Sequence, residues 1–137
     1  KMEMETPHIV PLSRQVIALL EQARAITGHK RYVFQSYRTH KPLSENTLIY
    51  AIYRLGYKSR MTVHGFRGVA ATELYEQGYM GDAIERQLAH SERNQVTAAY
   101  NHAEHLSYRR KMMQDYADYL DNVQGGRLIA FPKAATA

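Results

Sequence analysis

The chain has 137 residues and no cysteine, and its 18 lysine and arginine residues outnumber 13 aspartate and glutamate residues, for a net charge of +5. This length fits one domain with a moderate core and leaves little room for a second. Without cysteine, a disulfide scaffold, a thiolate metal site and a cysteine nucleophile are all excluded. No apolar run approaches the roughly 18 residues of a membrane span, and no signal peptide opens the chain, so we expect no membrane partner.

The first part of the chain predicts an extended segment followed by two helices. Residues 7–11 contain two prolines, each of which disfavours helix before it. Residues 13–28 and 44–56 show apolar positions at helical spacing, and each stretch opens with a serine cap and closes with a glycine. Between these helices, residues 32–34 predict either a brief strand or a loop anchor.

The second part of the chain keeps a helical pattern almost to its end. Gly78, the cap residue Asn94 and the pair Gly125-Gly126 help to divide this pattern into four predicted helices, over residues 64–76, 82–89, 94–100 and 104–123. The predicted class is therefore mainly α, with at most a short β remnant at the N-terminus.

The positive charge is concentrated before residue 61. Residues 1–60 hold ten lysine and arginine residues against four acidic ones, whereas residues 61–120 hold six against eight. A basic half can face a polyanion, most often nucleic acid, but an ordinary solvated surface explains the charge equally well. The candidate DNA-binding side chains are Arg38, Lys41, Arg54, Lys58 and Arg60.

His64 and Arg67 form the first candidate site. Residues at i and i+3 share one helix face, so both side chains would point to the same place at a helix start, where the helix dipole favours an anion. Arginine grips two phosphate oxygens with its planar fork, and histidine exchanges a proton near neutral pH. Surface ion pairing or helix capping explains the same two residues without a site.

His90 and Tyr100 are weaker candidates when each is taken alone. His90 closes a predicted helix, where a cationic side chain is favourable for structural reasons. Tyr100 is one of eleven tyrosines, and a phenol with a pKa near 10 is a poor nucleophile unless cations or a base assist it.

The order of these residues resembles the tyrosine recombinase, or phage integrase, family. The resemblance rests on four runs: TVHGFR at 62–67, AATEL at 70–74, IERQLAH at 84–90 and AAY at 98–100. It is strongest toward integrases of satellite phages and genomic islands, through YNHA at 100–103, RRKMMQ at 109–114 and ADYLD at 117–121. Residues 7–13 also resemble the segment that follows the catalytic β-hairpin of this family.

The resemblance implies a role for each motif residue. Tyr100 attacks the scissile phosphodiester and forms a 3′-phosphotyrosyl link. Arg67 holds the non-bridging oxygens, His64 accepts a proton or binds the phosphate near Tyr100, and His90 donates a hydrogen bond to the phosphate. Lys1 stands ten residues before Pro11, where the family carries the hairpin lysine that protonates the departing 5′-oxygen.

The resemblance also implies what the chain lacks. No segment matches the family's first catalytic arginine, which lies on a helix before the hairpin. The opening run KMEME does not look like a natural start either, so we expect a piece of a longer protein, inactive alone. In this division, residues 1–124 are a partial catalytic domain, and residues 125–137 are a tail that is flexible or docks in cis or in trans.

The implied partners are double-stranded DNA attachment sites, further copies of the protein in a tetramer, and DNA-bending accessory proteins, in the bacterial cytoplasm. No cofactor is implied, and His102 and His105 lack the companion ligands that would predict a metal site. Two other functions remain open: a non-catalytic DNA-binding or assembly module, such as a prophage remnant, and a type IB topoisomerase, which shares the tyrosine chemistry.

Overall fold

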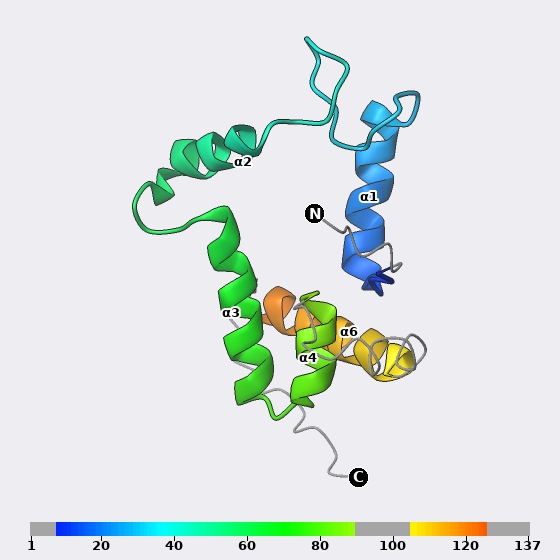
Figure 1. Cartoon of the computed structure of the whole chain (residues 1–137), viewed down its shortest axis with the longest axis vertical. Helices are drawn as coiled ribbons and strands as arrows, with labels where there is room; N and C mark the ends of the chain where they lie inside the picture. The colour runs from blue at the N-terminus through cyan, green and yellow to red at the C-terminus, as the bar shows by residue number, and fades with distance from the viewer. Residues whose placement is uncertain (1–7, 90–104, 126–137) are drawn as a thin grey trace, which may run out of the picture. The chain divides into compact units, whose positions relative to one another are not determined.

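The computed structural model describes residues 8–89 and 105–125 (Figure 1). As predicted, this part of the chain is mainly α and contains no strand; a lone antiparallel bridge joins Gln35 and Pro42. Within the described ranges, no helix is long and apolar enough to cross a membrane. The helical elements are α1 (Arg14–Thr27), α2 (Glu45–Ile52), the π-helical turn η1 (Tyr53–Tyr57), α3 (Val63–Glu76), α4 (Gly81–Gln87) and α6 (Leu106–Gln124).

The ends of α1 and α2 follow from local chemistry. Gly28 follows α1 as predicted, and a Cβ at this position would lie only 2.5 Å from the Arg24 carbonyl oxygen. The second helix widens into η1 and ends around Gly56, whose φ of +87° is a conformation that glycine adopts without strain. Both predicted glycine stops are therefore confirmed.

The segment between these two helices is a loop, so the strand alternative for residues 32–34 is wrong. Its backbone is held by two cross-loop hydrogen bonds, from Leu43 N–H to the Phe34 carbonyl (3.0 Å) and from Ser36 N–H to the Lys41 carbonyl (2.8 Å). A strand needs a partner along its whole length, and here the pairing stops after a few residues.

The chain divides into two compact units, which we describe separately. The basic unit comprises residues 14–72 and holds ten lysine and arginine residues against two acidic ones. The core unit comprises residues 8–13 together with the described residues after Thr72, and there four basic residues face seven acidic ones. This division lies inside the region that the sequence predicted as one partial domain.

The core unit holds every buried apolar side chain of the described residues. Its centre is a cluster from α3, α4 and α6 with the turn between α3 and α4, made of Leu74, Tyr79, Ile84 and Met112. Figure 1 shows α4 lying across α6. Burying an apolar side chain of this size contributes about 1.5–3 kcal/mol, so this cluster is the main source of packing energy in the described part of the chain.

Two hydrogen bonds tie the beginning of α4 and the turn before it to α6. The Tyr79 hydroxyl donates to Asp115 Oδ2 (2.7 Å), and the Met80 backbone N–H donates to the Tyr108 hydroxyl (3.1 Å). Burial, together with the hydrogen bond to the Asp115 carboxylate, raises the pKa of the Tyr79 phenol, so this hydroxyl keeps its proton throughout the physiological range.

Candidate active site

The start of α3 is fixed by the loop residue before it. Thr62 Oγ1 accepts a hydrogen bond from the backbone N–H of Gly65 (2.9 Å), which satisfies one of the amide donors that a helix start leaves free. The helix therefore begins at Val63, one residue before the predicted start. His64 and Arg67 then lie on the same face of the first turns, with the positive end of the helix dipole beside them.

The two side chains differ in exposure. His64 is exposed, whereas Arg67 is half-buried and its Nε is shielded from solvent without a hydrogen-bond partner among the described residues. Guanidinium carries only donors, and leaving a buried donor unsatisfied costs about 1–3 kcal/mol. An anion that reached Arg67 would remove this cost, so the site favours an anionic ligand.

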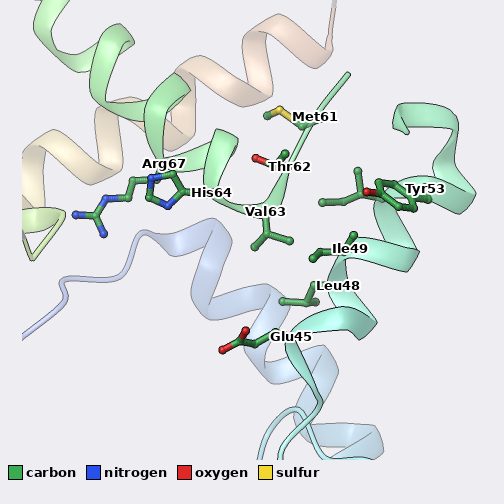
Figure 2. Close-up of a pocket in the computed structure, with 10 residues that line it drawn as sticks. Glu45, Leu48, Ile49, Tyr53, Met61, Thr62, Val63, His64 and Arg67 are labelled. Carbon is green, nitrogen blue, oxygen red and sulfur yellow. The ribbon is translucent and has the colours of Figure 1, made fainter. Parts of the chain in front are cut away.

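A pocket of about 620 Å³ opens between α2 and the start of α3, within the basic unit (Figure 2). Figure 2 shows Val63 pointing toward α2, while the Arg67 guanidinium extends away from Leu48 and Ile49. The pocket therefore has an apolar wall on the α2 side, and His64 and Arg67 line it from the start of α3. Its lining residues are Glu45, Leu48, Ile49, Ile52, Tyr53, Met61, Thr62, Val63, His64 and Arg67.

All five predicted DNA-binding side chains lie on the basic unit and are exposed. Two of them stack near tyrosine rings: the Lys58 ammonium lies 5.9 Å from the Tyr53 ring centre, and the Arg60 guanidinium lies 5.8 Å from the Tyr57 ring centre. Exposed cations beside aromatic rings are common on protein surfaces that bind nucleic acids. The paired residues are five and three positions apart in the sequence, a spacing that the charge count alone did not use.

Of the five predicted catalytic residues, the structure places His64 and Arg67. Lys1, His90 and Tyr100 lie outside the described residues, as do His102, the predicted helix over 94–100 and the tail beyond Gly125. Residues 8–89 and 105–125 contain no cluster of three histidine, aspartate or glutamate side chains suited to a metal ion.

Sequence reasoning missed one residue that the structure singles out. Arg109 is only 3% exposed and donates hydrogen bonds to the side chain of Gln87 and to the backbone of Ile9. In the sequence it was merely the first letter of the RRKMMQ run, and its exposed neighbour Arg110 has the same local pattern. No local signal distinguishes the two, because the partners of Arg109 are 22 and 100 residues away.

Comparison with known proteins identifies the family. The phage integrase family matches residues 1–106, which include both His64 and Arg67 and the predicted positions of His90 and Tyr100. The chain belongs to this family, as the motif order predicted.

Three similar curated proteins are integrases. The integrase of Enterobacteria phage P4 is 51% identical over 125 residues, which cover 88% of this chain and 28% of that protein. The prophage integrases IntZ and IntA of Escherichia coli K12 are 44% and 35% identical, over 91% and 94% of this chain and 31% and 32% of their own lengths. The chain thus spans less than a third of each of these relatives. No solved structure matches it.

Proposed function

We propose that this chain is the catalytic part of a longer site-specific DNA recombinase, which integrates or excises a prophage or genomic island. The observation that carries the proposal is the family match across the motif residues, combined with the capped helix start that holds His64 and Arg67 on one face. The similarity to phage and prophage integrases supports the choice of a mobile element as substrate.

The proposed reaction exchanges one phosphate ester for another. The Tyr100 phenolic oxygen attacks the scissile phosphorus, a bond from phosphorus to tyrosine forms, and the bond from phosphorus to the 5′-oxygen breaks. The phenolic proton passes to His64, and Lys1 gives a proton to the departing 5′-oxygen. A 5′-hydroxyl from a second strand then reverses the step, so the bond energy is kept in the phosphotyrosine and no ATP is consumed.

Arg67 is proposed to stabilise the transition state of this exchange. Negative charge develops on the non-bridging oxygens of the pentavalent phosphorus, and a fixed guanidinium fork lowers the barrier by meeting that charge without reorganisation. The unsatisfied Nε of Arg67 supports this role, since this donor has no acceptor among the described residues and a phosphate oxygen would supply one. His90 adds a further donor to the same oxygens.

The basic unit is proposed to lie against the DNA backbone, with Arg38, Lys41, Arg54, Lys58 and Arg60 neutralising phosphates. The assembled form is a tetramer on double-stranded attachment sites in the bacterial cytoplasm, aided by DNA-bending proteins. The tail after residue 124 links one copy to itself or to its neighbour. Each of these statements extends the family resemblance to the whole protein.

The test is covalent capture on DNA. The full-length protein is incubated with a suicide attachment-site duplex whose nicked strand diffuses away after cleavage, and the products are separated on a denaturing gel. We expect wild-type protein to form a covalent adduct and Tyr100→Phe to form none while it binds the duplex normally. Tyr50→Phe, which removes a hydroxyl from an exposed tyrosine of α2, serves as the matched control and should form the adduct.

Two results would contradict the proposal in different ways. An adduct with Tyr100→Phe would mean that another tyrosine is the nucleophile. Normal DNA binding without any adduct from the wild-type protein would favour the alternative function, a non-catalytic DNA-binding or assembly module.

A further inference from the structure

Arg109 is a buried cation whose acceptors all come from its own chain. Its Nε and Nη2 both donate to Gln87 Oε1, at 3.0 and 2.8 Å, and Nη2 also donates to the Ile9 carbonyl oxygen at 2.7 Å. Arg109 lies on α6, Gln87 is the last residue of α4, and Ile9 belongs to the segment before α1. We call this set of three hydrogen bonds the Arg109 clamp.

In the clamp, neutral oxygen acceptors bind a buried charge, and this fixes the orientation of the acceptor groups. Burial, helped by the nearby Arg86, lowers the pKa of Arg109, but an arginine remains charged at physiological pH. A buried charge needs hydrogen-bond acceptors, and bonds to a charged group are stronger than neutral ones. Since guanidinium only donates, the Gln87 amide must turn its oxygen toward Arg109, and the end of α4 is held in one orientation.

The three clamped residues flank the three predicted catalytic residues that the structure does not describe. Ile9 follows Lys1 by eight positions, Gln87 precedes His90 by three, and Arg109 follows Tyr100 by nine. Each of the three predicted catalytic residues is therefore near in sequence to a residue of the Arg109 clamp.

The clamp adds to the packing at the end of α4 and uses other groups. The hydrophobic cluster joins α4 to α6 through Ile84, and Leu88, next to Gln87, packs against this cluster. The hydrogen bonds of Tyr79 and Met80 hold the start of α4 and the turn before it. Loss of the clamp would leave these contacts in place and remove the hydrogen bonds that orient Gln87, three positions before His90.

We propose that Arg109 is a positioning residue of the active site: it fixes the flanks of the segments that carry Lys1, His90 and Tyr100, and so sets their approach to the scissile phosphate. This inference rests on the proposed recombinase function. It assigns Arg109 no contact with DNA. A displacement of about 1 Å in a reacting group can lower a rate 100-fold, so the clamp affects the rate of cleavage more than the binding of DNA.

The experiment measures single-turnover cleavage of the suicide duplex by the full-length protein over a range of protein concentrations. Gln87→Met keeps the side-chain length and removes the acceptor, whereas Gln87→Glu keeps an acceptor and gives Arg109 a carboxylate. We expect Gln87→Met to lower the maximal cleavage rate about 100-fold with an unchanged half-saturating concentration. Gln87→Glu should stay within a few-fold of wild type.

Two matched controls and one second variant keep the test decisive. Gln77→Met removes a glutamine in the turn after α3 whose amide donates to Glu73, four positions earlier. Arg110→Met removes the exposed neighbour of Arg109, and both variants should cleave normally. Arg109→Lys keeps the charge but cannot reach both acceptors, and should cleave at least tenfold more slowly even if Gln87→Met fails to fold.

Thermal unfolding of each variant separates positioning from folding. The proposal is overturned if Gln87→Met and Arg109→Lys, while folded at the assay temperature, cleave at the wild-type rate. It is also overturned if Gln87→Glu is as slow as Gln87→Met, because a retained acceptor would then make no difference. If the wild-type protein gives no adduct, the proposed recombinase function is wrong; this outcome is distinct from a failure of the Arg109 proposal, in which the wild-type protein cleaves.

Discussion

The two units of this chain are built on opposite principles. The core unit buries Leu74, Ile84 and Met112 almost completely and carries more acidic than basic side chains. The basic unit buries no side chain at all, and even its apolar positions are at least partly exposed. A surface that combines excess positive charge with uncovered apolar and tyrosine side chains is suited to contact with a large anion, whereas the core unit supplies packing energy.

Arg109 in the core unit and Arg67 in the basic unit differ in the same way as the two units. Arg109 meets acceptors from its own chain, and its hydrogen bonds hold three parts of the core unit together. Arg67 has a shielded Nε without an acceptor among the described residues. The same side chain therefore works as internal structure where the fold provides acceptors, and as a candidate ligand-binding group where the fold provides none.

Replacing Arg67 should produce the largest effect and tests this contrast directly. Arg67→Lys keeps the charge and loses the two-pronged grip, so we expect cleavage to fall about 10²–10³-fold, as for loss of a transition-state donor elsewhere. Unfolding temperature and DNA affinity should stay near wild type. Arg60→Lys, on the same unit, is the control and should cleave normally; cleavage by Arg67→Lys within a few-fold of wild type would make Arg67 a distant point charge.

Shortening one apolar side chain in each unit should show where the stability lies. Met112→Ala opens a cavity in the core cluster and should lower the free energy of unfolding by about 2–5 kcal/mol. Leu48→Ala, at a half-exposed position of the basic unit, should change it by about 0.5 kcal/mol or less. Urea unfolding of the two variants measures both values. Equal losses would show that the basic unit is packed as firmly as the core unit.

Removing surface charge should give the smallest effect and locate the DNA-facing unit. The double variant Lys58→Gln with Arg60→Gln should reduce the slope of log affinity against log salt concentration by about 2, because each phosphate contact contributes roughly 0.9. Arg110→Gln with Lys111→Gln removes the same charge from the core unit and should leave the slope unchanged. Equal changes in slope would assign DNA contact to both units; a change only in the second pair would reverse the assignment.

Much of the described fold was predictable because it depends on neighbours in sequence. Glycine stops act within one helical turn, so the ends of α1 and of the second helix were readable from the chain alone. Ser44 precedes α2 as predicted, but its side chain makes no capping hydrogen bond. The shared face of His64 and Arg67 follows from their spacing, and Thr62, two positions before His64, caps the helix start. The family also followed from the motif order, since those motifs are local runs at fixed spacing.

The tertiary structure decided what depends on distant partners. Residues 32–34 have the composition of a strand, but a strand requires a paired chain, and only a short loop contact is present. The division at Thr72 became visible only when contacts grouped the charges into a basic and an acidic unit. Arg109 and Arg110 look alike in sequence, and only packing against α4 and the segment before α1 buried the first and left the second exposed. Local hydrogen bonds and helix faces depend on residues close in sequence, so the sequence determines them. Burial depends on segments that can be far apart in sequence, as Arg109 and Ile9 are, 100 positions from each other.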